Sequence, residues 1–393
     1  MNLDSSLNYD DLRRRAKRYV PRIAFDFLEG GVDDELGIAR NSNAFSHVAL
    51  LPQYLGDPGT PALETTLFGQ TFSAPVGIAP TGGACLFRQD ADLSLARAAR
   101  DANIPFIISG ASTATMEDIA AVARDTSWYQ LYLAKDRAIS DDMVARADRC
   151  GFSTLVLSVD VPSRVRRERD LRNGFARPMR PTPAVVLEAL THPAWLWSYF
   201  TGQKLTMSNW VKYGPAGATP DQLMQWCAQH FPTPSTWDDV KRIRKLWPRN
   251  FVIKGLMHPD DCRRASELGV DGVIISNHGG RQLDRSPAPV EVLPLIRDLV
   301  GDRVTLMLDS GIRRGSDIAV SLALGAKFCF VGRWTLYGVA AAGEPGARHA
   351  IKQIRTELTA VMRQLGAMRP DELGPRFLMP DARSPFDHNL GTI

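Results

Sequence analysis

Short apolar runs rich in β-branched residues recur along the chain from residue 74 onward. Segments with helical periodicity lie between most of them, and several end on Gly or Asn, where helices commonly stop. Continuous apolar strands that alternate with helices are typical of a parallel sheet covered by helices. The pattern predicts eight strands, at 74–80, 105–110, 127–133, 154–160, 251–256, 272–278, 304–311 and 327–333.

Two architectures contain such a sheet, a (β/α)8 barrel and an open, doubly wound sheet. Eight successive units match the barrel. The open sheet is less favoured because no GxGxxG turn follows the first predicted strand. The sequence therefore predicts a (β/α)8 TIM barrel over 71–375. Residues 1–70 precede it, with a helix and then a short segment over 10–30, and 376–393 form a C-terminal tail.

The spacing of the units breaks once, because the fourth and fifth predicted strands begin 97 residues apart. This predicts an insert over 176–235, at the end of the barrel where active sites lie. Its part 176–215 is aromatic, apolar and basic but too short and interrupted to span a bilayer, as expected for a segment in a membrane interface. A lid or a subunit contact explains it equally well. The residues concerned are Trp195, Trp197, Tyr199, Phe200, Trp210, Tyr213, Arg177, Arg180, Lys204 and Lys212, against the single acid Glu188.

Composition narrows the class of protein. The 393 residues are 44% hydrophobic and 23% charged, as in globular proteins, and a net charge of +4 gives no reason to expect nucleic acid. Five scattered cysteines without a CxxC pair indicate a reducing compartment and no metal site. The N-terminal twenty residues are polar and lack the apolar core of a signal peptide, so we expect a cytoplasmic chain.

The predicted strand ends carry polar side chains, and in this fold such positions perform the chemistry. Taken singly they are weak evidence: a lone lysine in a strand can belong to a structural ion pair, and HGGR can be a turn with a surface histidine. A polar group at each of eight strand ends is harder to explain by chance. They include Thr81, Ser109, Gln130, Tyr132, Ser158, Asp160, Lys254, His278, Asp309 and Arg333.

The last two strand ends indicate a phosphate site. Glycines let the backbone approach an anion, and arginines bind phosphate. DSGIRRG (309–315) and Gly332-Arg333 therefore predict a site for a cofactor phosphate. Because the chain has neither a Walker loop nor a dinucleotide turn, a mononucleotide is the natural candidate.

The other strand ends suggest the reaction. An aspartate such as Asp160 beside His278 would orient the imidazole and stabilise its protonated form, which makes a general base. Arg167 and Arg281 provide two planar cations for a small carboxylate. Lys254 could offset negative charge that develops on a cofactor ring. Together these groups predict oxidation of a 2-hydroxy acid.

These motifs resemble the FMN-dependent 2-hydroxy acid dehydrogenases and oxidases over about residues 9–375. SNHGGRQLD (276–284) together with DSGIRRG is the most specific part, and 27–41 and the insert look most similar to mandelate and respiratory lactate dehydrogenases. The resemblance implies that 1–70 cap the barrel and that the insert attaches the enzyme to a membrane, at the cytoplasmic face of the inner membrane. It also implies a homo-oligomer, a tetramer in this family.

Site roles follow from the resemblance position by position. His278 would be the base paired with Asp160, and Tyr132 would hydrogen-bond the substrate, whose carboxylate Arg167 and Arg281 would hold. Lys254 would lie by flavin N1 and O2. The remaining contacts to FMN would come from Pro80, Thr81 and Gly82 near N5, Ser109, Gln130 and Ser158 at the ring, Asp309 at the ribityl chain, and Gly311, Arg313, Gly332 and Arg333 at the phosphate.

One position departs from the family pattern. Phe27 stands where the family has a tyrosine that hydrogen-bonds the substrate carboxylate. This predicts either weaker carboxylate binding or a substrate with an ester, an amide or extra bulk there. Gly83 and Ala111 are small and would permit an aromatic group.

Several alternatives stay open from the residues alone. The substrate could be mandelate-like or lactate-like, and His278 could remove either the α-proton or the hydroxyl proton. Reoxidation would be by a membrane quinone if the insert docks, or by oxygen with release of hydrogen peroxide in a soluble oxidase. A silent barrel that acts as a scaffold would need the catalytic residues to be lost, and they are present.

Overall fold

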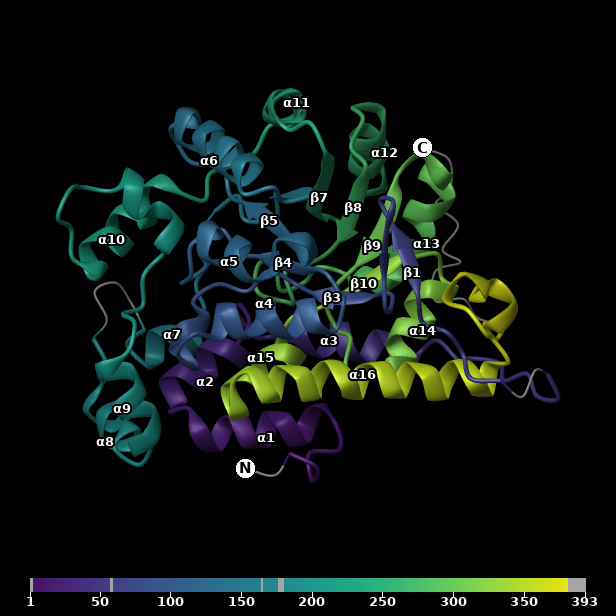
Figure 1. The fold of residues 1–393 in the computed structure, drawn as a ribbon, viewed down its shortest axis with the longest axis horizontal. Helices are drawn as coiled ribbons and strands as arrows, with labels where there is room; N and C mark the ends of the chain where they lie inside the picture. The colour runs from purple at the N-terminus through teal and green to yellow at the C-terminus, as the bar shows by residue number, and fades with distance from the viewer. Residues whose placement is uncertain (1–2, 57–58, 164, 176–179, 381–393) are drawn as a thin grey trace.

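A computed structural model describes residues 3–56, 59–163, 165–175 and 180–380. Its centre is a closed barrel of eight parallel strands in the order β3 to β10, and β10 pairs with β3 to close it (Figure 1). The predicted TIM barrel is therefore confirmed. The strands are β3 (Val76–Ile78), β4 (Phe106–Ile108), β5 (Ser127–Leu131), β6 (Thr154–Ser158), β7 (Asn250–Leu256), β8 (Gly272–Ile275), β9 (Thr305–Leu308) and β10 (Phe328–Val331).

Helices follow the strands and cover the outside of the barrel. Most of them turn a buried apolar face toward the sheet, as their apolar periodicity predicts, whereas the last and longest packs against neighbouring helices. They are α4 (Ala91–Asp101), α5 (Met116–Ala123), α6 (Arg137–Arg149), α11 (Trp237–Leu246), α12 (Pro259–Glu267), α13 (Pro289–Val300), α14 (Gly315–Ala323), α15 (Arg333–Ala342) and α16 (Glu344–Leu365). Short 3-10 helices are η1 (Ala84–Leu86), η2 (Arg124–Thr126), η4 (Gly301–Arg303), η5 (Pro370–Glu372) and η6 (Pro375–Phe377).

A hairpin of β1 (Thr65–Leu67) and β2 (Gln70–Phe72) fills the end of the barrel where the strands begin. Its Phe68 ring lies 6.0 Å from Trp128, and its Phe72 ring lies 5.9 Å from Phe328. Because these apolar side chains occupy that end, the opposite end, where the strands finish, is the one available for a ligand.

The N-terminal segment contains more helix than the sequence predicts. Residues 10–30 form two helices, α1 (Tyr9–Tyr19) and α2 (Arg22–Glu29), and α3 (Leu36–Ser46) follows. Pro21 separates the first two because it stands at the N-cap of α2 with extended backbone. Tyr9 of α1 packs edge-on against Trp334 and Tyr337 of α15, which fixes α1 beside the C-terminal helices (Figure 1).

The insert between β6 and α11 projects to one side of the barrel (Figure 1). The aromatic residues of 176–215 do not form one set: Trp195 and Trp210 are buried, whereas Trp197 and Phe200 are 74% and 67% exposed. Among the described helices, none is both long and apolar enough to cross a bilayer. Arg177, with the rest of 176–179, and residues 381–393 of the predicted tail lie outside the described residues. The insert forms α7 (Glu168–Arg172), α8 (Pro183–Ala189), α9 (Pro193–Thr201), η3 (Ser208–Tyr213) and α10 (Pro220–His230).

Candidate active site

The polar strand ends converge on one cavity of about 900 Å³. This is near the upper end of the ~300–1,000 Å³ range of ligand pockets, so a mononucleotide and a small substrate can share it. Gln130, Ser158 and Asp160 are not among the residues that line it. The other predicted site residues line it: Phe27, Pro80, Thr81, Gly82, Ser109, Tyr132, Arg167, Lys254, His278, Arg281, Asp309, Gly311, Arg313, Gly332 and Arg333, together with the small residues Gly83 and Ala111.

His278 and Asp160 form a pair at the ends of β8 and β6. Nδ1 of His278 lies 3.0 Å from Oδ1 of Asp160, so Nε2 is the ring nitrogen left for chemistry. Burial would raise the pKa of Asp160, but the charges of His278 and Lys254 outweigh it and lower that pKa. The carboxylate is therefore ionised and can hold the imidazole in one orientation.

The backbone of His278 is itself constrained. Its φ of 57° lies in the left-handed region, which a non-glycine residue rarely adopts and which is often found at functional sites. Its N–H donates to Oγ of Ser276 at 3.1 Å, and the N–H of Gly279 donates to Oγ of Ser310 at 3.0 Å. Two serine hydroxyls thus hold consecutive amides of this loop.

Lys254 connects these parts from the middle of the barrel. The side chain is buried, and Nζ lies 3.2 Å from Oδ2 of Asp309, 3.7 Å from Oδ2 of Asp160 and 2.7 Å from Oγ of Ser276. Burial would lower the pKa of Lys254, but the two carboxylates outweigh burial and raise that pKa. The cavity floor therefore has a permanently charged ammonium.

Two arginines flank Phe27, whose ring lacks the hydroxyl group of a tyrosine. The guanidinium carbons of Arg167 and Arg281 lie 5.1 Å and 5.3 Å from the centre of its ring, within the range of cation–π attraction. Burial and the charges of Arg167 and Arg333 lower the pKa of Arg281. An anion bound between these cations would relieve their repulsion, so this part of the cavity suits a carboxylate.

Another part of the cavity suits a phosphate. The N-terminal end of α15 begins there at Arg333, where free amides and the helix dipole favour an anion. Arg313 faces it, with its guanidinium carbon 4.5 Å from the centre of the Tyr9 ring. A Cβ at Gly311 would lie 2.1 Å from the carbonyl oxygen of Asn41, and φ there is 89°, so only glycine fits beside α3.

The buried polar atoms that have no hydrogen-bond partner among the described residues include Nε2 of Gln130, Oγ of Ser158 and Oγ1 of Thr81. Buried polar atoms are nearly always partnered. A flavin ring offers carbonyl oxygens and ring nitrogens that such donors match, so the residues present fit FMN.

The fold and these sites define the class of protein as a flavin-binding α/β barrel, and comparisons identify the family. The family model described as FMN-dependent dehydrogenase matches residues 16–380. The (S)-mandelate dehydrogenase of Pseudomonas putida is 36% identical over 98% of this chain and 97% of its own. An L-lactate dehydrogenase of Pseudomonas aeruginosa is 35% identical over 92% of this chain and 95% of its own.

A solved structure agrees. A crystal structure described as the monotopic membrane protein (S)-mandelate dehydrogenase has a TM-score of 0.92 and 36% identity, with 95% of this chain and 99% of that chain covered. The chain belongs to the FMN-dependent dehydrogenase family. It is an FMN-dependent enzyme of the 2-hydroxy acid dehydrogenase and oxidase group, as the motifs suggest.

Sequence reasoning assigned no role to several residues of this site. Ser276 and Ser310 stand inside the two most specific motifs, so a hydroxyl beside the histidine and beside Asp309 was a usable signal. Phe175, whose ring centre lies 4.6 Å from that of Phe27, and the insert residues Leu205 and Met207 have no such signal, because only the folded insert brings them to the cavity.

Lys254→Met should lower the free energy of unfolding at pH 7 by about 3–5 kcal/mol, the usual cost of breaking a buried ion pair. In the wild type the pKa of Asp160 lies below its usual value, so this contribution is present above about pH 4 and is lost only as the pH falls through the lowered pKa. In the variant, Asp160 lacks the Lys254 cation and can take up a proton more easily. The difference in unfolding free energy between wild type and variant should therefore shrink toward low pH.

Urea unfolding from about pH 3 to pH 8, with and without added FMN, measures this and separates the ion pair from cofactor binding. Lys241→Met is the control, because its pair with Asp238 is exposed and contributes little. A deficit of the same size at every pH would contradict the role given to the buried charges.

Proposed function

We propose that the protein oxidises an (S)-2-hydroxy acid, mandelate-like or lactate-like, to the 2-oxo acid with His278 as the base. The observation that carries this is the His278–Asp160 pair in the same cavity as Arg167 and Arg281. Bound FMN supplies the acceptor for the two electrons. Anaerobic mixing of the purified protein with a panel of 2-hydroxy acids, followed by flavin absorbance, tests it.

The residues divide the work of substrate binding and proton transfer. Arg167 and Arg281 bind the carboxylate, and Nε2 of His278 takes up a proton from C2 or from the hydroxyl group. Burial, reinforced by Asp160, raises the pKa of Tyr132, so its phenol keeps its proton and can donate a hydrogen bond to the substrate. The Lys254 ammonium, close to Asp309 and Asp160, would stabilise negative charge on the flavin ring.

His278→Ala tests the base. The variant should still bind FMN, because the phosphate and ring contacts come from other strands, but it should lose roughly 10²–10⁴-fold of the rate of flavin reduction. Stopped-flow absorbance of the flavin measures the rate. Near-normal reduction would remove His278 from the mechanism, and loss of bound flavin would make its role structural.

We further propose that the enzyme docks on the cytoplasmic face of the inner membrane through α8 and α9 and passes electrons to a quinone. Leu187, Leu190, Trp197 and Phe200 are each more than 60% exposed there, whereas soluble surfaces rarely gather such side chains. A solved relative described as monotopic supports the same reading. Without docking, the enzyme would be a soluble oxidase that uses oxygen.

Replacing Leu187, Trp197 and Phe200 by serine should move the enzyme from the membrane pellet to the supernatant while flavin reduction by substrate persists. Coupling to an added quinone in vesicles should fall in parallel. The control replaces Leu246, Leu295 and Leu299, which are exposed elsewhere, by serine and should stay with the membrane. If the wild type fractionates entirely without the membrane, α8 and α9 form a lid or a subunit contact.

Phe27 favours a second candidate within this function, a substrate that is less polar or larger near the carboxyl group. A tyrosine there would donate a hydrogen bond to a carboxylate, worth about 1.5–3 kcal/mol. The Phe27 ring is instead packed with its centre 4.6 Å from that of Phe175, so a hydroxyl there would lie beside an apolar ring as well as near the two arginines.

We therefore expect Phe27→Tyr to lower turnover of the true substrate. Steady-state assays of wild type and variant on lactate, mandelate and mandelate esters measure this. Improved turnover of every free acid, with no substrate made worse, would instead show that an ordinary 2-hydroxy acid is the substrate and that the missing hydrogen bond merely weakens its binding.

A further inference from the structure

The left-handed backbone of His278 is a conformation that persists only where the surrounding structure holds it. Two serine hydroxyls hold the amides of His278 and Gly279. A third support is the side chain of Asn277, the residue before the histidine, which is buried. Its amide group ties the histidine loop to a part of the chain that precedes the barrel.

The amide of Asn277 makes four hydrogen bonds, which is its full capacity. Oδ1 accepts from the backbone N–H of Gly280 at 3.2 Å and from Nδ2 of Asn41 at 2.8 Å. Nδ2 donates to Oδ1 of Asn41 at 2.6 Å and to the carbonyl of Pro287 at 3.1 Å. The two asparagines therefore form a reciprocal pair that fixes the turn around the histidine from one side.

Asn41 belongs to α3 and is itself firmly placed. Its side chain is buried, and its carbonyl oxygen lies beside Gly311 of the predicted phosphate loop. At the start of the same helix, the N–H of Gly37 donates to Oδ1 of Asp284 at 2.9 Å, so a second bond joins α3 to the chain that follows the histidine loop. The helix can therefore act as a fixed support for that loop.

We propose that Asn41 is a positioning residue for the base. It acts through Asn277, whose amide keeps the strained backbone of His278 in place and so keeps the imidazole 3.0 Å from Asp160. This rests on the proposed function, in which His278 takes up the proton. Without the Asn41 amide the backbone can relax toward a commoner conformation, and the imidazole moves away from the position that proton transfer needs.

Asn41→Leu tests the proposal, because leucine has a similar size but removes both bonds to Asn277. Stopped-flow absorbance with a 2-hydroxy acid that reduces the wild-type flavin should show the limiting rate of reduction fall roughly 10- to 100-fold, the effect of a displacement of about 1 Å. The substrate concentration at half of that rate should change far less, because Arg281 is held separately by the carbonyl of Gly30 at 2.6 Å. Asn41→Ala, which only shortens the side chain, takes its place if the leucine variant does not fold.

The same substitution in the His278→Ala enzyme separates positioning from fold stability. If Asn41 acts through the imidazole, its loss should cost nothing further once the imidazole is gone. The double variant should then reduce its flavin at the slow rate of His278→Ala alone. A merely structural role would slow the enzyme by the same factor with and without the histidine.

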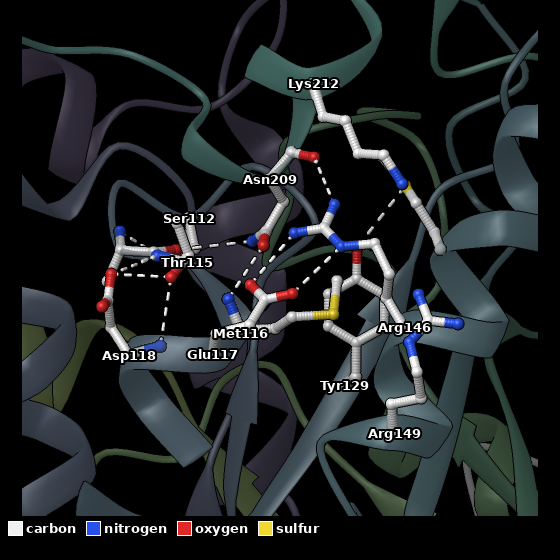
Figure 2. A network of polar contacts seen from close by, with 12 residues as sticks. Ser112, Thr115, Met116, Glu117, Asp118, Tyr129, Arg146, Arg149, Asn209 and Lys212 are labelled. Atoms are coloured by element: carbon white, nitrogen blue, oxygen red, sulfur yellow. Dashed lines mark hydrogen bonds and ion pairs between the residues drawn. The ribbon is translucent and has the colours of Figure 1, made fainter. Parts of the chain in front are cut away.

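Two control variants accompany these measurements. Asn43→Leu removes an exposed asparagine from the same helix and should change neither stability nor rate. Arg146→Gln breaks a buried network in the barrel wall (Figure 2), where Nε and Nη2 of Arg146 donate to both carboxylate oxygens of Glu117 at 3.1 and 3.0 Å. The residues labelled in that network lie outside the cavity lining, so this variant should lower the melting temperature and leave flavin reduction unchanged.

The outcomes distinguish this proposal from the one on which it rests. A wild-type rate in Asn41→Leu, or the same fractional loss with and without His278, overturns the positioning role while the proposed function stands. A loss of rate in Arg146→Gln as large as that in Asn41→Leu overturns it too. If His278→Ala reduces its flavin at nearly the wild-type rate, the base assignment fails first and the positioning role fails with it.

Discussion

The buried ammonium of Lys254 is the interaction on which the rest of the site depends. A charge in a low-dielectric interior is costly unless it is paired, and here it is shared between carboxylates at the ends of β6 and β9 and a hydroxyl at the end of β8. Strand register brings these groups together, since Ser158 pairs with Lys254. Gly255 permits the approach, because a Cβ there would lie 2.5 Å from that of Asp160. The contacts that align these strands therefore also orient the imidazole of His278.

The arginines of the site differ from Lys254, because they lie close to other positive charges. Arg281 and Arg333 both donate to the carbonyl of Gly30, and Arg281 and Arg167 lie over the Phe27 ring, which has no hydroxyl. The fold fixes the positions of these like charges, and an anion bound between them would lower their electrostatic repulsion. In the proposed function, a carboxylate bound near the arginines would lower this repulsion, and the apolar side chains of Phe27 and Leu205 line the same cavity.

Most of the barrel could be predicted from the sequence, because continuous apolar strands and amphipathic helices are local patterns. The polar strand ends could be found for the same reason: barrel topology puts them at one mouth. The arrangement of the insert could not be predicted in this way. Trp195 and Trp197 look alike in the sequence, yet Trp195 donates a hydrogen bond to the carbonyl of Leu86, whereas Trp197 is exposed. Phe175 and Leu205 also could not be found, because their contacts to the cavity are set by docking between distant segments. The helix over Arg22–Glu29 was missed because a proline breaks the period.

The bonds to Gly30 have a consequence for how the protein is made. Gly30 and Arg333 are 303 residues apart in the chain. The amino-terminal part of the site is therefore complete only after β10 and the start of α15 have been synthesised. At ordinary rates of synthesis this wait is on the order of 15–60 s. During that time α2 lacks its contacts with α15, although its other neighbours α1, α7 and α8 have already been synthesised. Gly311 and Arg333, which would help to hold the cofactor phosphate, are also made late, so this part of the site can form only when the chain is nearly complete.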